Sequence, residues 1–102
     1  MSLTVVITTL GSQEEARVLA RQLVEERLAA CVQITAIESV YRWDDAVETA
    51  GEWRLDCKTP SERADALSER IKALHPYDEP EIVVLSADAS AGYLVWAEAS
   101  TR

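Results

Sequence analysis

The sequence contains one histidine, His75, and a run of acidic residues follows it closely. Asp78, Glu79 and Glu81 come within the next six positions, and two prolines stiffen the same segment. A neutral imidazole nitrogen with carboxylate oxygens nearby is a donor set for a borderline divalent cation such as copper(II) or zinc. The other interpretation is that His75 stabilises the C-terminus of a helix through its dipole, while the acidic side chains are solvated. The residues alone leave both interpretations open.

The other side chains with reactive chemistry are two cysteines and a lysine. Cys31 and Cys57 lack the C-x-x-C spacing of a zinc ribbon and do not suggest a disulfide framework. A free cysteine is ordinarily a small buried hydrophobe, and Cys57 on an apolar strand face is expected in the core. Lys58 ends a predicted strand on its polar face, where it is either a surface lysine, a partner of Glu81 or a contact for an anion.

The sequence carries no catalytic motif that we recognise. It has no G-x-S-x-G, P-loop or H-E-x-x-H pattern. A catalytic pair of Cys31 and His75 needs the fold or an oligomer to bring them together, and no third orienting group is evident. We therefore do not expect an enzyme.

Charge and composition exclude several classes of partner. The 102 residues include 10 Lys and Arg against 18 Asp and Glu, a net charge of -8, so nucleic acid and anionic membrane surfaces are not expected partners. The chain is 48% hydrophobic, and residues 1–102 are expected to form a single domain. No apolar run is long enough to cross a bilayer and no basic leader is apparent, so the expected location is the cytoplasm.

Hydrophobic periodicity and capping signals define the elements that must position these residues. Ser12 with Glu15 predicts a capping box before the first helix, and Thr59 with Glu62 predicts a second. The order is strand, helix, strand, strand, helix, strand and a terminal helix, over about residues 3–9, 12–29, 30–43, 52–58, 59–75, 82–85 and 90–101, with a loop over 44–51. This order predicts an α+β fold of the ferredoxin-like β-α-β-β-α-β plan. Its antiparallel sheet carries both main helices on one face.

The second strand is much longer than the ordinary strand of about 5–6 residues. Its large apolar residues change parity between Ile34 and Ile37, which predicts a bulge or bend. Part of it must project beyond its own sheet, and a projecting apolar edge aggregates unless another chain pairs with it. Tyr41, Arg42 and Trp43 are residue types that anchor interfaces, so we expect a closed homo-oligomer assembled by strand pairing between subunits.

Five blocks of the sequence resemble the CutA family of divalent-cation tolerance proteins, in family order over nearly the whole chain. They are Leu-Val-Glu-Glu-Arg-Leu-Ala-Ala-Cys-Val at 23–32, Ser-Val-Tyr-Arg-Trp at 39–43, Glu-Trp-x-Leu with Lys-Thr in 52–59, His-Pro-Tyr-Asp with Pro-Glu-Ile in 75–82, and Tyr-Leu-x-Trp at 93–96. The chain departs from the family pattern at Gln33, Asp44, Asp45, Cys57 and Asp78.

The resemblance implies a ferredoxin-like subunit, a homotrimer superficially similar to PII signalling proteins, and binding of copper(II) or a related divalent metal that is not required for folding. The expected metal ligands are His75, Asp78 and Glu81, with Cys31 as a possible soft or redox-sensitive ligand near the subunit junction. The expected lining of an inter-subunit cleft is Trp43, Glu52, Lys58, Tyr77 and Trp96, which otherwise serve as interface packing. The second hypothesis is a PII-like signalling or scaffolding trimer whose cleft binds a small anion or a protein partner.

Overall fold

The fold follows the predicted α+β plan. The computed structural model describes residues 2–102, and no helix in that range is long and apolar enough to cross a membrane. The strands pair antiparallel throughout, in the order β2-β3-β1-β4. The elements are β1 (Leu3–Leu10), α1 (Gln13–Glu25), β2 (Cys31–Trp43), β3 (Ala46–Pro60), a 3₁₀ turn (Ser61–Arg63), α2 (Ala64–Leu74), β4 (Val83–Ala87) and α3 (Ala91–Ser100). The predicted order of strands and helices is therefore confirmed.

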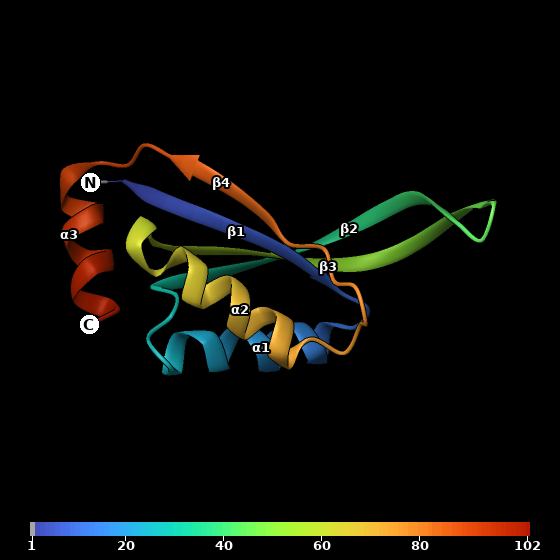
Figure 1. Ribbon diagram of the computed structural model, residues 1–102, viewed down its shortest axis with the longest axis horizontal. Helices are drawn as coiled ribbons and strands as arrows, with labels where there is room; N and C mark the ends of the chain where they lie inside the picture. The colour runs from blue at the N-terminus through green and yellow to red at the C-terminus, as the bar shows by residue number, and fades with distance from the viewer. Residues whose placement is uncertain (1) are drawn as a thin grey trace.

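The core lies between the sheet and the two main helices. In Figure 1, α1 and α2 lie together on one side of the sheet, and α3 stands at the far end near the N-terminus. Alternate residues of the strands meet the apolar stripes of the helices, because successive strand side chains point to opposite faces. The largest fully buried side chains of this core are Leu10, Leu23, Leu55, Leu67 and Ile71. A smaller cluster joins α3 to the sheet through Leu94 and Ala97 against Leu3 and Ala30.

The two predicted helix starts have different outcomes. Ser12 is the N-cap of α1, and its hydroxyl accepts a 3.1 Å hydrogen bond from the backbone N–H of Glu15, which confirms the first capping box. The second capping box is wrong, because Thr59 belongs to β3 and its hydroxyl donates to the carbonyl of Leu28 at 2.8 Å. Thr59 therefore anchors the connection between α1 and β2, and α2 begins without a side-chain cap.

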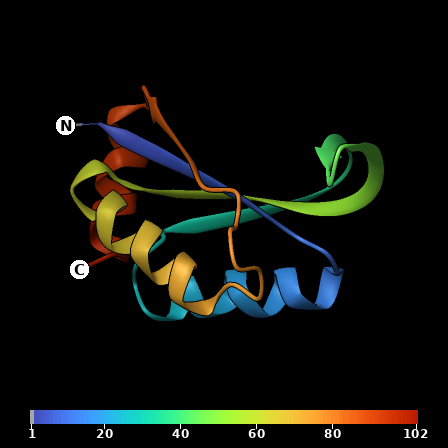
Figure 2. The same ribbon diagram turned by 45° about the vertical axis from the view of Figure 1, so that its right-hand side comes forward.

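The hairpin of β2 and β3 extends well beyond the helices (Figure 1), and its outer part curves (Figure 2). The strands have 13 and 15 residues, and only residues 53–60 of β3 pair with β1. Residues 46–52 pair with β2 alone, so the outer half of the hairpin is a two-stranded ribbon. The ribbon lengthens the subunit to 45 Å against 24 and 21 Å in the other directions. The predicted projection of the second strand is confirmed.

The hairpin differs from the prediction in its turn, and the predicted bulge or bend is a bend. The pairing register of β2 and β3 runs unbroken from Cys31 to Trp43, so there is no bulge, and the ribbon curves instead (Figure 2). Ile34 packs against the core, whereas Ile37 and Tyr41 lie on the opposite face of β2, because successive strand side chains alternate. Residues 46–51 are strand and not loop, because pairing with β2 overrides their acidic composition. The turn is only Asp44 and Asp45, whose φ values of 52° and 62° suit a two-residue hairpin.

An ion pair joins the two main helices on the side away from the sheet. The Arg70 guanidinium donates to the two carboxylate oxygens of Glu26 at 2.8 and 2.9 Å. Gln22 donates a further bond to the same carboxylate at 2.8 Å. The hydrogen bonds from Arg70 and then from Gln22 lower the pKa of Glu26 from 4.5 to about 2.

We expect this carboxyl group to titrate near pH 2, and its contribution to stability follows from that shift. Because the folded pKa lies below the unfolded value, the contribution is fully present above about pH 4.5 and is lost as the pH falls toward 2. A carboxyl-detected NMR titration measures the pKa directly, and Arg70→Gln is expected to bring it back toward its ordinary value. Titration of Glu26 near 4.5 in the unaltered protein would contradict the assigned ion pair.

Candidate functional site

A pocket of about 640 Å³ lies where the hairpin leaves the sheet. The end of β1 forms its floor, the ribbon of β2 and β3 forms one wall, and the segment between α2 and β4 forms the other. Its lining residues are Thr9, Gly11, Tyr41, Trp43, Ala50, Gly51, Glu52, Tyr77, Asp78, Glu79 and Glu81. The pocket thus combines three aromatic side chains with four carboxylates.

His75 stands behind this pocket and is buried, with 8% of its surface exposed. Its Nδ1 lies 3.1 Å from the backbone N–H of Tyr77, and its Nε2 lies 2.8 Å from the carbonyl oxygen of Thr9. An N–H can only donate and a carbonyl can only accept, so Nδ1 accepts and Nε2 carries the proton. These two bonds fix the neutral imidazole in one tautomer. They leave neither ring nitrogen with a lone pair for a metal ion.

The two bonds of His75 hold Tyr77 in the pocket wall. The rings of His75 and Tyr77 lie with centroids 4.8 Å apart, tilted by 57°. The Tyr77 hydroxyl reaches Gly11, where an added Cβ would meet that oxygen at 3.0 Å. Burial, followed by the negative charge of Glu52, raises the pKa of Tyr77. A glycine at position 11 therefore makes room for the tyrosine.

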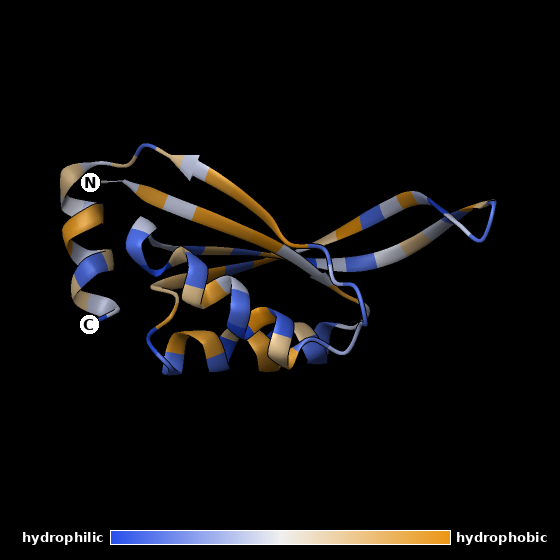
Figure 3. Cartoon of the chain, viewed as in Figure 1, coloured by the Kyte–Doolittle hydropathy of each residue, from blue (hydrophilic) through white to orange (hydrophobic). Residues whose placement is uncertain are grey.

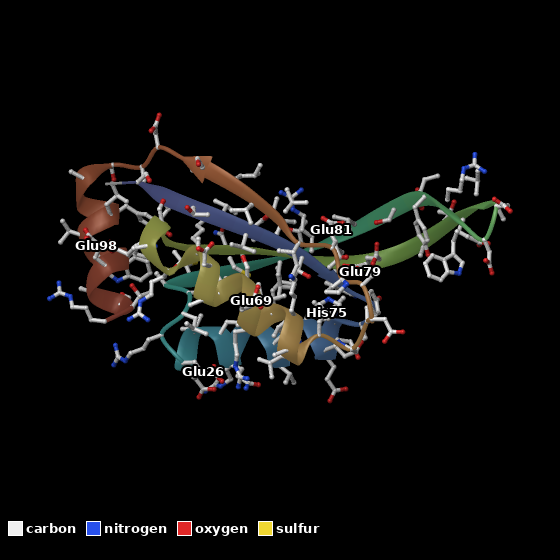
Figure 4. The ribbon with its side chains drawn as sticks, viewed as in Figure 1. Glu26, Glu69, His75, Glu79, Glu81 and Glu98 are labelled. Atoms are coloured by element: carbon white, nitrogen blue, oxygen red, sulfur yellow. The ribbon has the colours of Figure 1, made fainter. Side chains whose placement is uncertain are left out.

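The acidic side chains that line the pocket have no basic side chain among them to balance their charge. Within residues 2–102, the carboxylates of Glu52, Asp78, Glu79 and Glu81 form no salt bridge, since the four ion pairs there involve other acids. Figure 4 shows Glu79 and Glu81 on the segment that follows His75 and leads into β4, away from Glu26 and Glu98. The pocket therefore carries a local excess of negative charge.

The four predicted metal ligands do not meet within one subunit. The described part of the chain holds no group of three or more His, Cys, Asp or Glu side chains arranged around a common metal position. Cys31 of β2 pairs with Lys58 of β3, and Lys58 pairs in turn with Val5 of β1. His75 bonds instead to Thr9, four positions further along β1. Four strand positions correspond to roughly 13 Å. Asp78 and Glu81 share the pocket lining, while His75 lies behind it and Cys31 lies elsewhere.

The predicted cleft residues fall into two groups at opposite ends of the sheet. Trp43, Glu52 and Tyr77 share the pocket. The other two meet around Tyr93 of α3: the Lys58 ammonium lies 5.9 Å from its ring centroid, and the Trp96 ring lies 5.3 Å from it. One subunit therefore presents two separate parts of the predicted cleft.

The two cysteines differ in environment. Cys57 is fully buried in the main core, and desolvation raises the pKa of its thiol to about 12, which confirms core packing. Cys31 is half-buried beside Tyr93, whose pKa is raised by burial and then by that cysteine. Cys31 therefore belongs to the group around Tyr93.

Sequence reasoning did not assign Thr9, Gly11, Tyr41, Ala50 or Gly51 to the pocket. Tyr41, which the sequence predicts at a subunit interface, shares a face of β2 with Trp43 two positions on and also lines the pocket. Its period-two spacing from Trp43 was the available signal. Gly11 gave no such signal, because its need for space arises from Tyr77, far away in the sequence.

The fold and the pocket together define a class: a ferredoxin-like α+β protein with a projecting hairpin and an acidic, aromatic pocket at its base. Comparison with known families then gives a definite result. The family description "CutA1 divalent ion tolerance protein" matches residues 4–100. The chain belongs to the CutA1 divalent ion tolerance protein family.

Individual relatives agree with this assignment. A divalent-cation tolerance protein CutA of Thermus thermophilus is 48% identical over 99 residues, covering 95% of this chain and 96% of the relative. The solved structure of CutA from Synechococcus elongatus superposes with a TM-score of 0.95 at 40% identity, covering 99% of this chain and 91% of that one. A chloroplastic CutA of Arabidopsis thaliana is 41% identical, covering 96% of this chain and 55% of the relative. None of these three names describes an enzymatic activity.

Proposed function

We propose that this chain acts as a homotrimer in tolerance to divalent cations. It takes up copper(II) at the acidic pocket without catalysing a reaction. The observation that carries the proposal is the pocket itself, in which Glu52, Asp78, Glu79 and Glu81 gather without any basic residue. We keep the cytoplasm as its proposed location.

The unpaired edges of the sheet support the trimer. In the order β2-β3-β1-β4 the outer strands are β2 and β4, and both lack a neighbour on one side. The β4 edge carries the exposed apolar residues Val83, Val84 and Leu85, and the hairpin carries Val40 and Val47 (Figure 3). Two different edges on one subunit favour head-to-tail pairing, which closes into a ring when the rotation between copies allows it. Such a ring joins the outer β2 edge of one copy to the β4 edge of the next.

The same ring supports an inter-subunit site. The pocket and the group around Tyr93 lie at opposite ends of one subunit, so only a neighbouring copy can bring them together. For copper(II), the pocket supplies Asp78 and Glu81 as oxygen donors, and the remaining donors come from water or from the adjoining copy. For a given set of oxygen, nitrogen or sulfur donors, affinity in the first-row divalent series peaks at copper, which favours this metal.

Calorimetric titration with copper(II) tests the proposed uptake. The double variant Asp78→Asn, Glu81→Gln is expected to bind at least about tenfold more weakly, a difference of roughly 1.4 kcal/mol, because two anionic carboxylate donors are replaced by neutral amides. The matched control Glu62→Gln, Asp65→Asn removes the same charge from exposed positions outside the pocket and is expected to keep the affinity. Equal losses of copper(II) affinity in the two double variants would show that overall charge, and not the two carboxylates of the pocket, causes the effect.

Light scattering of the same samples tests the trimer, with an expected mass of about 34 kDa from three chains of 11.3 kDa.

The charge of the pocket bears on the second hypothesis, that of a signalling or scaffolding trimer whose cleft binds a small anion or a protein partner. A small anion in this pocket would meet four carboxylates and no basic side chain, and Lys58 lies at the other end of the sheet beside Tyr93. Like charges repel strongly where water is partly excluded. The lining therefore favours a cation over an anion as the ligand of this pocket.

A further inference from the structure

We propose that a groove between α1 and α2 docks a short segment of another protein, in which apolar side chains stand next to lysine or arginine. The groove has a volume of about 320 Å³ and lies where the first half of α1 meets the end of α2. It shares no lining residue with the acidic pocket at the base of the hairpin. The inference therefore goes beyond copper uptake and does not depend on it.

The helix groove stays open in the proposed ring. The ring joins the outer β2 edge of one copy to the β4 edge of the next, and neither strand contributes a residue to the groove. Figure 1 shows α1 and α2 together on one side of the sheet, with the hairpin projecting past them. A docking segment can thus reach the groove in the assembled protein, and a closed trimer presents three copies of it.

The floor of the helix groove is apolar. Leu10 at the end of β1 and Leu19 of α1 are buried, and Leu74 borders the groove from the end of α2. On the rim, the side chain of Val18 stays 60% exposed. An apolar side chain laid against Val18 and Leu74 would remove their exposed surface from water, which is favourable in proportion to the apolar area covered.

The rim of the helix groove is acidic. Glu14 and Glu15 line it from the first turn of α1, and no lysine or arginine of residues 2–102 is among the lining residues. The four ion pairs in that range involve neither carboxylate. Glu15 accepts a 3.2 Å hydrogen bond from the Ser12 hydroxyl within the helix cap, which leaves Glu14 as the principal partner for an added charge.

This combination of floor and rim defines the chemistry of the partner. A basic side chain beside an apolar anchor matches it, because complementary charges guide the encounter and fix the orientation of two proteins. An anionic partner, such as nucleic acid or a membrane surface, would meet two carboxylates of its own sign.

The size of the helix groove favours part of a larger partner over a free small molecule. Its volume is at the lower limit of the roughly 300–1,000 Å³ that is ordinary for small-molecule sites. Protein interfaces are commonly held by a few anchor side chains in such pockets, with polar groups around the rim. The groove therefore has room for an anchor side chain, and the acidic rim lies beside it.

The decisive experiment compares three tetrapeptides with blocked ends: Arg-Leu-Leu-Arg, Glu-Leu-Leu-Glu and Arg-Ser-Ser-Arg. Each is titrated into the full chain while proton–carbon NMR spectra follow the methyl groups of Leu10, Val18 and Leu74, with EDTA present so that no metal contributes. We expect Arg-Leu-Leu-Arg to shift these signals saturably, and each of the other two peptides to bind at least about tenfold more weakly. Equal binding of Arg-Leu-Leu-Arg and either other peptide, or no saturable shift up to about 10 mM, would overturn the proposal.

Two variants locate the site. Val18→Lys is expected to weaken binding of Arg-Leu-Leu-Arg at least about tenfold, because it places a like charge on the rim and removes apolar surface. Glu14→Gln is expected to weaken it about threefold, as for an exposed charge pair. Glu62→Gln is the matched control, since Glu62 is exposed and lies outside the helix groove.

The variants also show which outcomes contradict the docking site. Equal losses in Glu14→Gln and Glu62→Gln would show that the overall charge of the protein attracts the peptide. Unchanged binding by Val18→Lys would place the peptide elsewhere on the molecule. Either result would overturn the proposal, and light scattering of the same samples checks that each variant keeps the mass of the unaltered protein.

Discussion

Replacing Val84 by lysine is expected to dissociate the assembled protein into subunits of 11.3 kDa. Val84 lies on the outer strand β4 and is 53% exposed in the subunit, so the fold of one chain tolerates a long polar side chain there. In the proposed ring the same position is covered by the hairpin of the next copy. Burying an unpaired ammonium costs several kcal/mol, and natural proteins use edge lysines to prevent strand pairing. In a closed trimer the cost of burying this ammonium arises at each of the three interfaces.

Light scattering at micromolar concentration measures this effect, with circular dichroism to check that the subunit stays folded. Val18→Lys is the matched control, because Val18 is 60% exposed on α1 and lies on neither edge of the sheet. The control is expected to keep a mass of about 34 kDa, three times 11.3 kDa. A trimeric Val84→Lys protein as stable as the unaltered one would show that β4 takes no part in assembly.

Replacing His75 by alanine is expected to lower the free energy of unfolding by about 3 kcal/mol. The ring is buried, and its loss leaves the Tyr77 N–H and the Thr9 carbonyl without their partners. Each buried polar group left without a partner costs about 1–3 kcal/mol, although water entering the space reduces this. Copper(II) affinity is expected to change less than about threefold, because neither ring nitrogen offers a free lone pair.

Urea unfolding measures the free energy of unfolding. The protein concentration is kept fixed, since the stability of an oligomer depends on concentration. Tyr77→Phe is the control, because it removes only a hydroxyl at the pocket surface and is expected to cost less than about 0.5 kcal/mol. A His75→Ala protein with unchanged stability and greatly weakened copper binding would reverse the roles. The histidine would then be a metal ligand and not a clamp.

These expectations give His75 and its acidic neighbours separate tasks. The histidine ties the segment after α2 to the end of β1, and the residues that follow it form the acidic wall of the pocket. On these expectations His75 has a structural role in the segment, and Asp78 and Glu81 keep the proposed role of metal ligands. Pro76 and Pro80 restrict the same segment, which helps to hold the wall in place.

Much of the fold could be predicted from local patterns. The Ser12 cap, the apolar stripes of α1 and α2 and the alternation around Leu55 each depend on neighbours only a few residues away. The long second strand also follows from its composition. The predictions that were wrong, the cap at Thr59 and the loop expected over residues 46–51, concern residues whose partners are distant or on another strand.

The sequence by itself determined the order of the elements, the projecting strand and the excess of negative charge, because these depend on residue type and short-range periodicity. Only the tertiary structure decided what His75 contacts and which acids share a pocket. Thr9 and Tyr77 meet His75 because β1 and the end of α2 pack together, and Glu52 faces Tyr77 because the ribbon passes over that junction. Such contacts arise from how the elements pack, and a local pattern contains no measure of the distance between segments.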